Sequence, residues 1–213
     1  MANTVTIRAE DVKQLREETG AGIMDCKRAL EESDGDLDRA KLWLREKGLA
    51  SAAKKAGRIV REGAIVSYIH HGARLGVLLE LNCETDFVAR TDDFQQLGRE
   101  LAMHVAGWPY TPLYIGREDV PADALEEHKR ALAEEAEREG RPGDRIPGIV
   151  EGKLNKWFEQ VCLLEQPYRD TDRRISDLVN EKVALLGENI RVARFARMAV
   201  GESAAEPGGG EAA

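Results

Sequence analysis

An alternating apolar run at residues 75–81 constrains the fold of this chain more than any other stretch. Apolar side chains occupy its odd positions: Leu75, Val77, Leu79 and Leu81. A period of two is typical of a β-strand. A second β-rich run, residues 64–70, precedes it across a short turn. Because so short a connection joins neighbouring strands, the two runs predict an antiparallel hairpin.

The strand pattern ends at a cluster of short polar residues, 82–86, and Phe87 follows directly. Side chains of this kind bond to nearby backbone groups and therefore start turns or helices. Phe87 has two interpretations at such a position. It either folds back into the core or projects from a loop as an anchor for a partner's pocket.

The first 50 residues predict a small three-helix module. Apolar residues recur at helical spacing in segments that begin near Ala9, Ile23 and Leu37. Helices this short are marginal alone and need each other's apolar faces. Ile23 and Met24 are adjacent, about 100° apart around a helix, so both cannot point straight inward. Core packing explains one of them, and at least one is expected at the edge or on the surface.

A basic segment, residues 51–61, follows this module. It is interpreted either as a linker helix or as an RNA-binding patch. The segment lacks the interleaved aromatic side chains on which bases stack. The net charge of the chain is −8, whereas non-specific nucleic-acid binding relies on basic surface. We therefore expect a connector and no nucleic-acid partner.

Residues 62–201 mix strand and helix patterns and predict a core domain of the α+β class. Residues 92–106 have one broad apolar face that includes His104, as an amphipathic helix does. Residues 121–162 predict a helical hairpin with a Pro-Gly turn. The final apolar stretch, residues 190–200, alternates imperfectly, which predicts an edge strand or a bulge.

The expected fold is an N-terminal three-helix bundle, followed by an antiparallel-sheet core with packed helices and a helical hairpin. The tail, residues 202–213, lacks the apolar side chains that order a segment and is expected to be disordered.

Enzymatic chemistry finds little support in the residue pattern. The phosphate-loop pattern G-x-x-x-x-G-K-[ST] does not occur. One group invites a metal or enzyme interpretation: His70, His71, Cys83 and Glu84. Adjacent strand residues face opposite sides, and the paired spacing of metal ligands is missing. We expect no metal, no cofactor and no covalent catalysis.

The number and spacing of the cysteines indicate the cellular compartment. Cys26, Cys83 and Cys162 are an odd, scattered set rather than a disulfide framework, which favours a reducing cytoplasm. No stretch approaches the roughly 18 apolar residues of a membrane span, and the first ten residues carry no apolar run like that of a secretory signal. We expect a cytoplasmic protein without a membrane partner.

Two motifs resemble one known family. Residues 82–90, NCETDFVAR, resemble the signature of bacterial elongation factor Ts, the guanine nucleotide exchange factor of elongation factor Tu. Residues 12–30, VKQLREETGAGIMDCKRAL, resemble the N-terminal module of that family, a ubiquitin-associated-like bundle. Shorter similarities follow at residues 101–106, 151–154 and 163–168. The resemblance runs from about Val5 to Val200 and indicates the compact form, with one core unit.

The resemblance implies a function by binding. It implies that the chain binds elongation factor Tu, GDP-bound and nucleotide-free, and that Phe87 wedges into its nucleotide domain with Asp86 beside it. Magnesium and phosphate contacts are then disturbed, and GDP leaves. The implied partner-binding residues are Thr85, Asp86, Phe87 and Val88 in the core, and Arg16, Ile23 and Met24 in the N-terminal module. His104 is implied as a further contact, although a core histidine explains it equally well.

The resemblance also implies a homodimer formed through the core sheet. Some compact members carry a cysteine near the last strand that bridges two copies. Residue 196 is alanine and its neighbours are not cysteines, so that disulfide is not possible. The alternative function is a ubiquitin-associated-like adaptor, which would bind a protein through the N-terminal module without affecting nucleotides.

Overall fold

The computed structural model describes residues 7–169, 171 and 173–202. The predicted disordered tail therefore lies outside the described residues from position 203 onward. The chain is of the α+β class, as predicted, with helices and a three-stranded antiparallel sheet. It divides into two compact units, and each is composed of several stretches of the chain.

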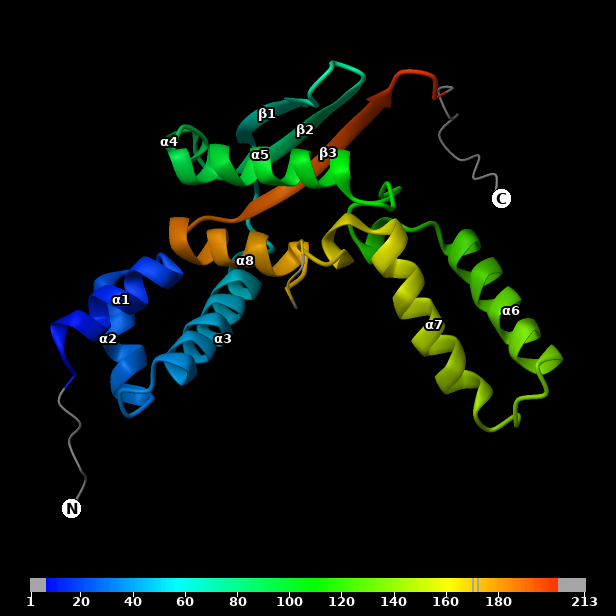
Figure 1. Ribbon diagram of the computed structural model, residues 1–213, viewed down its shortest axis with the longest axis horizontal. Helices are drawn as coiled ribbons and strands as arrows, with labels where there is room; N and C mark the ends of the chain where they lie inside the picture. The colour runs from blue at the N-terminus through cyan, green and yellow to red at the C-terminus, as the bar shows by residue number, and fades with distance from the viewer. Residues whose placement is uncertain (1–6, 170, 172, 203–213) are drawn as a thin grey trace. The chain divides into compact units, whose positions relative to one another are not determined.

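The first unit contains residues 1–63, 82–94 and 177–191. Its N-terminal part is a bundle of α1 (Ala9–Thr19), α2 (Ile23–Glu32) and α3 (Leu37–Lys55), drawn in blue and cyan in Figure 1. Its core is formed by one buried group: Leu15, Cys26, Ala29, Leu30 and Ala40. These positions are the apolar faces that the helical spacing predicted.

Helix α3 is longer than the sequence pattern predicted. Asp36 caps its start by accepting a hydrogen bond from the backbone of Arg39 at 2.9 Å. The helix continues to Lys55, so the first half of the expected linker, residues 51–61, forms the C-terminal end of α3. Lys54 and Lys55 lie at the C-terminal end, where positive charge interacts favourably with the helix dipole.

Helix α8 (Ile175–Leu186) packs against α3 within the first unit. Arg45 forms an ion pair with Asp177 at 2.7 Å. At Gly48 the two helices come close, since a Cβ there would lie 3.5 Å from that of Ala184.

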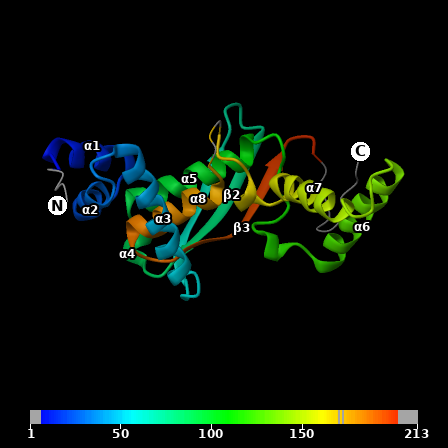
Figure 2. The ribbon, with the colours of Figure 1, turned by 90° about the horizontal axis from the view of Figure 1, so that it is seen from below.

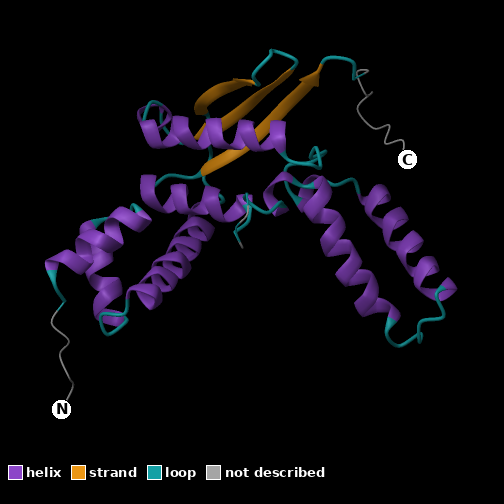
Figure 3. Ribbon diagram, in the orientation of Figure 1, coloured by secondary structure: helices purple, strands orange, loops and turns teal. Residues whose placement is uncertain are grey.

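The second unit contains residues 64–81, 95–176 and 192–213. Its sheet has the order β1 (Glu62–Ile69), β2 (Leu75–Cys83), β3 (Ile190–Ala199), shown in orange in Figure 3. The predicted hairpin of β1 and β2 is confirmed, with His70 donating its backbone N–H to Leu75 at 2.8 Å. β3 lies at an edge of the sheet, as its imperfect alternation predicted.

Helix α5 (Asp92–Gly107) covers one face of this sheet. Val66, Val77 and Leu79 are buried on that face. Gly98 permits the close approach of helix and strand, because a Cβ at this position would lie 2.6 Å from Val66 Cγ2.

The expected helical hairpin is formed by α6 (Ala122–Arg138) and α7 (Ile146–Val161). Figure 2 shows the two helices running alongside each other. His128 stacks on Trp157 with ring centroids 4.3 Å apart. Short 3-10 turns, Arg117–Asp119 and Leu163–Glu165, lie at the base of the hairpin.

Candidate functional site

The strand β2 leads directly into α4, a single helical turn at Asp86–Ala89. Thr85 is extended and caps the turn, its Oγ1 accepting the backbone N–H of Val88 at 3.4 Å. At the other end of the turn, the Thr91 hydroxyl donates to the Val88 carbonyl at 2.8 Å. The polar residues of this stretch therefore start a helix, as the sequence predicted.

Phe87 projects from α4 into solvent, with 79% of its surface exposed. Ala89, two positions later, is buried, with 6% exposed. Residues two apart on a helix lie about 200° apart around its axis, so anchoring Ala89 in the core turns Phe87 outward. The interpretation of Phe87 as a core residue is therefore wrong for this chain, and the interpretation as a projecting aromatic describes its position.

Asp86 lies on the surface beside Phe87. Its carboxylate pairs with Arg90 at 2.7 Å, one helical turn later, and 43% of the Asp86 side chain stays exposed. Exposed pairs of this kind contribute little to stability, about 0–1 kcal/mol. The carboxylate is thus held in place yet accessible.

Two acidic residues far apart in the sequence hold the base of α4, and the sequence analysis missed one of them. Glu188 accepts the backbone N–H groups of Glu84 and Thr85 at 3.1 and 3.0 Å, and the Thr85 hydroxyl at 2.6 Å. Glu84 in turn accepts the backbone N–H of Asn189 at 2.7 Å. This bond, with the nearby Arg58 guanidinium, lowers the pKa of Glu84.

His70 and Cys83, two of the residues that invite a metal or enzyme interpretation, are engaged in other contacts. Cys83 is buried, and its thiol donates to the Thr85 carbonyl at 3.1 Å. Burial, with the Glu188 charge, raises its pKa to about 11, which leaves the thiol unreactive. His70 bonds Tyr68 through its ring at 2.9 Å. Within the described part of the chain, no three His, Cys, Asp or Glu side chains are grouped closely enough to hold a metal ion.

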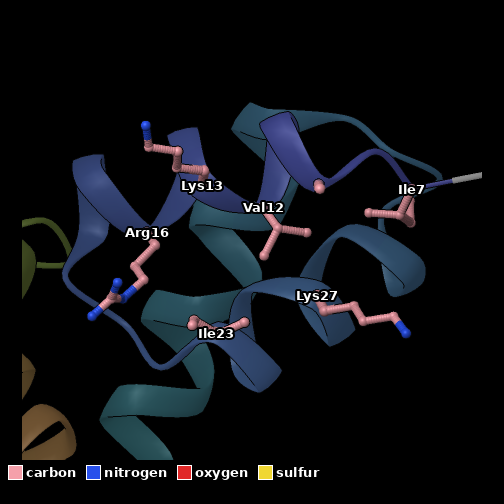
Figure 4. Close-up of a pocket in the computed structure, with 7 residues that line it drawn as sticks. Ile7, Val12, Lys13, Arg16, Ile23 and Lys27 are labelled. Carbon is pink, nitrogen blue, oxygen red and sulfur yellow. The ribbon is translucent and has the colours of Figure 1, made fainter.

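The N-terminal bundle carries a second exposed feature, an apolar hollow of about 380 Å³ between α1 and α2. In Figure 4, Val12 and Ile23 lie across the hollow from each other, with cationic side chains around it. Its lining residues are Ile7, Ala9, Val12, Lys13, Arg16, Ile23 and Lys27. Two of the three predicted contacts of this module, Arg16 and Ile23, therefore come together.

Both apolar candidates on α2 are exposed. Ile23 has 56% and Met24 71% of its surface accessible. Met24 lies outside the lining of the hollow. The expectation that at least one of these neighbours faces outward is confirmed, and the helix buries Cys26, Ala29 and Leu30 instead.

His104 is a core residue. Only 8% of it is exposed, and it stacks on Trp108 with ring centroids 5.0 Å apart. Its Nε2 lies 3.0 Å from Oε1 of Gln166. Of the two interpretations of His104, a histidine with a satisfied ring describes the structure, and a direct surface contact does not.

Comparisons with known proteins place the chain among translation elongation factors. A family model described as "Elongation factor TS" matches residues 52–202. Elongation factor Ts of Carboxydothermus hydrogenoformans is 52% identical over 201 residues, which cover 94% of this chain and 92% of the relative. Elongation factor Ts of Coprothermobacter proteolyticus is 56% identical over 197 residues, covering 92% and 99%. The chain belongs to the elongation factor Ts family.

The family model begins within α3, and the N-terminal bundle lies almost wholly before it. The full-length relatives extend the similarity through most of this bundle, since they cover more than nine-tenths of the chain. None of the described helices is both long enough and apolar enough to cross a membrane.

Proposed function

We propose that the chain is a guanine nucleotide exchange factor that binds elongation factor Tu·GDP and promotes the release of GDP. The observation that carries this proposal is Phe87, a large aromatic held outward on a capped turn in a member of the elongation factor Ts family. Phe87 and Asp86 enter the partner near its magnesium and phosphate site. Thr85 and Val88 belong to the same contact.

The mechanism needs no covalent step. A protein that binds the nucleotide-free partner more tightly than the GDP-bound partner must weaken GDP binding by the same factor, because the two equilibria are linked. Inserting Phe87 into the partner transfers an exposed aromatic surface out of water, and this gain offsets the loss of magnesium and phosphate contacts.

The N-terminal module provides a second contact surface for the same partner. Ile23 and Met24 supply exposed apolar surface, and Arg16 supplies a guanidinium at the rim of the hollow. An apolar side chain ringed by acidic groups complements this surface in shape and charge.

Release of fluorescent GDP from elongation factor Tu tests the proposal. Substoichiometric amounts of the chain are expected to accelerate release with turnover, and Phe87→Ala to abolish most of the acceleration. The adaptor alternative predicts a different pair of results. Binding would then be lost with Ile23→Ser, while GDP release would be the same with and without the wild-type chain.

We also infer that a second copy of this chain covers the open face of the sheet. Ile65, Leu78 and Met198 expose 69%, 53% and 76% of their surfaces. Ile65 and Leu78 alternate with residues buried under α5, so they lie on the opposite face. The ion pair of Glu80 and Arg194, at 2.6 Å, joins β2 and β3 on this side. Apolar burial on an isologous surface supports a homodimer without a disulfide at Ala196.

A further inference from the structure

Both carboxylate oxygens of Glu188 accept hydrogen bonds from the two residues that precede α4. Glu188 lies in the short connection between α8 and β3, just after Gly187, which has a φ of 77°. Its Oε2 receives two backbone N–H groups, from Glu84 and Thr85, and its Oε1 receives the Thr85 hydroxyl. These donors belong to Glu84 and Thr85, the two residues directly before Asp86 and Phe87.

A reciprocal set of bonds ties the same two segments together. Glu84 accepts from the backbone of Asn189, and the Asn189 amide donates to the carbonyls of Ala56 and Arg58 at 3.3 and 2.9 Å. Arg58 also pairs with Glu84 at 3.3 Å. The base of α4 is therefore fixed to two other segments of the first unit.

The Thr85 hydroxyl transmits this constraint into α4. A hydroxyl has one proton to donate, and at 2.6 Å from the Glu188 carboxylate that proton points toward Oε1. An oxygen lone pair is then left for the N–H of Val88, at 3.4 Å. Glu188 thus holds the hydroxyl oxygen that caps α4 and keeps its proton turned away from Val88.

Helix α4 is held otherwise by the burial of Ala89 and by the bond of the Thr91 hydroxyl to the Val88 carbonyl. It has four residues, and among them only Ala89 is buried. A helix this short does not persist by itself, because forming the first turn fixes several residues for very few hydrogen bonds. The direction of Phe87 consequently depends on polar anchoring at Thr85 rather than on burial of Phe87 itself.

We propose that Glu188 is a positioning residue for nucleotide exchange, which holds the turn bearing Asp86 and Phe87 in its partner-binding orientation. This inference rests on the proposed exchange function. A pre-ordered aromatic loses less conformational freedom on insertion, so more of the binding free energy remains to weaken GDP binding.

Glu188→Gln in the full chain is the informative substitution. It preserves size, but its amide nitrogen cannot accept the hydrogen bonds that one carboxylate oxygen accepts now. We expect GDP release at saturating concentrations of the chain to slow about tenfold, as for the loss of one hydrogen bond to a charged group. Glu137→Gln, on the exposed surface of α6, removes the same charge and serves as the matched control.

A double-mutant cycle with Phe87→Ala separates positioning from general destabilisation. If Glu188 acts by positioning this turn, then Glu188→Gln slows GDP release much less once residue 87 is alanine, because only the Asp86 part of the contact remains to be positioned. An equal slowing in both backgrounds would overturn the proposal. All variants are compared at a temperature at which circular dichroism shows them to be folded.

Amide hydrogen exchange of the isolated chain tests the anchoring without the partner. The amides of Thr85 and Val88 are expected to exchange at least about tenfold faster in Glu188→Gln, while those of Leu15 and Leu30 keep their protection. Unchanged protection at Thr85 and Val88 overturns the positioning role. If the wild-type chain itself does not accelerate GDP release, the exchange function fails instead, and hydrogen exchange still decides the anchoring by Glu188.

Discussion

His104 donates its Nε2 proton to Oε1 of Gln166 across 3.0 Å in the interior of the second unit. The direction of this bond follows from the other bonds of Gln166. Its amide nitrogen donates to the carbonyls of Tyr110 and Gln160 at 2.9 and 3.0 Å. Because carbonyls only accept, the amide oxygen must face His104, and the neutral imidazole carries its proton on Nε2.

The burial of His104 makes folding sensitive to mild acid, and the bond to Gln166 offsets only part of this effect. Burial lowers the pKa of His104, so the folded state takes up a second ring proton, on Nδ1, less readily than the unfolded state does. Stability is then full above the unfolded pKa of about 6.5 and falls as the pH drops below it. Urea denaturation from pH 7.5 to 5 should show the loss.

His104→Gln is expected to flatten that pH dependence, because an amide nitrogen replaces Nε2 without titrating in this range. His128 has a pKa lowered in the same direction by burial, so part of the dependence should remain until it is replaced as well. The carboxylates lose their stabilising partners only at lower pH, near or below their ordinary pKa of about 4.5. An unchanged slope in His104→Gln would show that this histidine does not titrate on unfolding.

Phe87→Ala is expected to separate function from stability. The exposed ring leaves no cavity, so the free energy of unfolding should change by less than about 0.5 kcal/mol. The complex with elongation factor Tu should weaken by about 2 kcal/mol or more, the loss typical of an aromatic anchor. Phe94→Ala is the contrasting variant, since Phe94 is fully buried, and it should lose about 3–5 kcal/mol of folding stability. Urea denaturation and a binding titration report the two quantities.

Gly98→Ala is expected to destabilise the core although alanine favours helices. The new Cβ would lie 2.6 Å from Val66 Cγ2, and overpacking costs about 1–3 kcal/mol. Gly152→Ala, in α7, is the control because a Cβ added there would meet no atom within 4 Å. That variant should gain about 0.5–1 kcal/mol. Adding Val66→Ala should recover part of the loss, and thermal unfolding measures all three.

Met198→Glu is expected to produce a monomer if the open sheet face joins two copies. The change places a charge among exposed apolar side chains, where burial against a second copy would leave it unpaired. Leu113→Glu is the control, since Leu113 is also 64% exposed but lies outside the sheet. Analytical ultracentrifugation distinguishes the masses. Dimers of Met198→Glu at the wild-type affinity would rule out this face as the interface.

Local patterns predicted the β1–β2 hairpin, the start of α4 and the apolar faces of the N-terminal bundle, because each depends on neighbours in sequence. The length of α3 was missed, because residues 51–61 were assigned to a separate linker, whereas the helix continues to Lys55. The side of α4 on which Phe87 lies also required the structure. That choice is made by the burial of Ala89 and by Glu188, which is 103 residues from Thr85.

Because Glu188 is so far from Thr85 in the sequence, no local pattern predicted that the two residues are in contact. An acidic residue after a helix-ending glycine is expected on a solvated surface, and no spacing rule connects it with a strand end in another part of the chain. Whether His104 is a core residue or a partner contact was open for a similar reason. An amphipathic pattern places a histidine on the inner face of a helix but does not identify Gln166 as its hydrogen-bond partner.

The burial of all three native thiols has a practical consequence for labelling. Cys26, Cys83 and Cys162 are fully buried, and burial raises the pKa of Cys83 to about 11 and that of Cys162 to about 12. Maleimides react with exposed thiolates. A cysteine introduced on the surface would therefore take a fluorophore selectively in the otherwise native chain. The distance from this single label to a second label on the partner could then be followed as the complex forms.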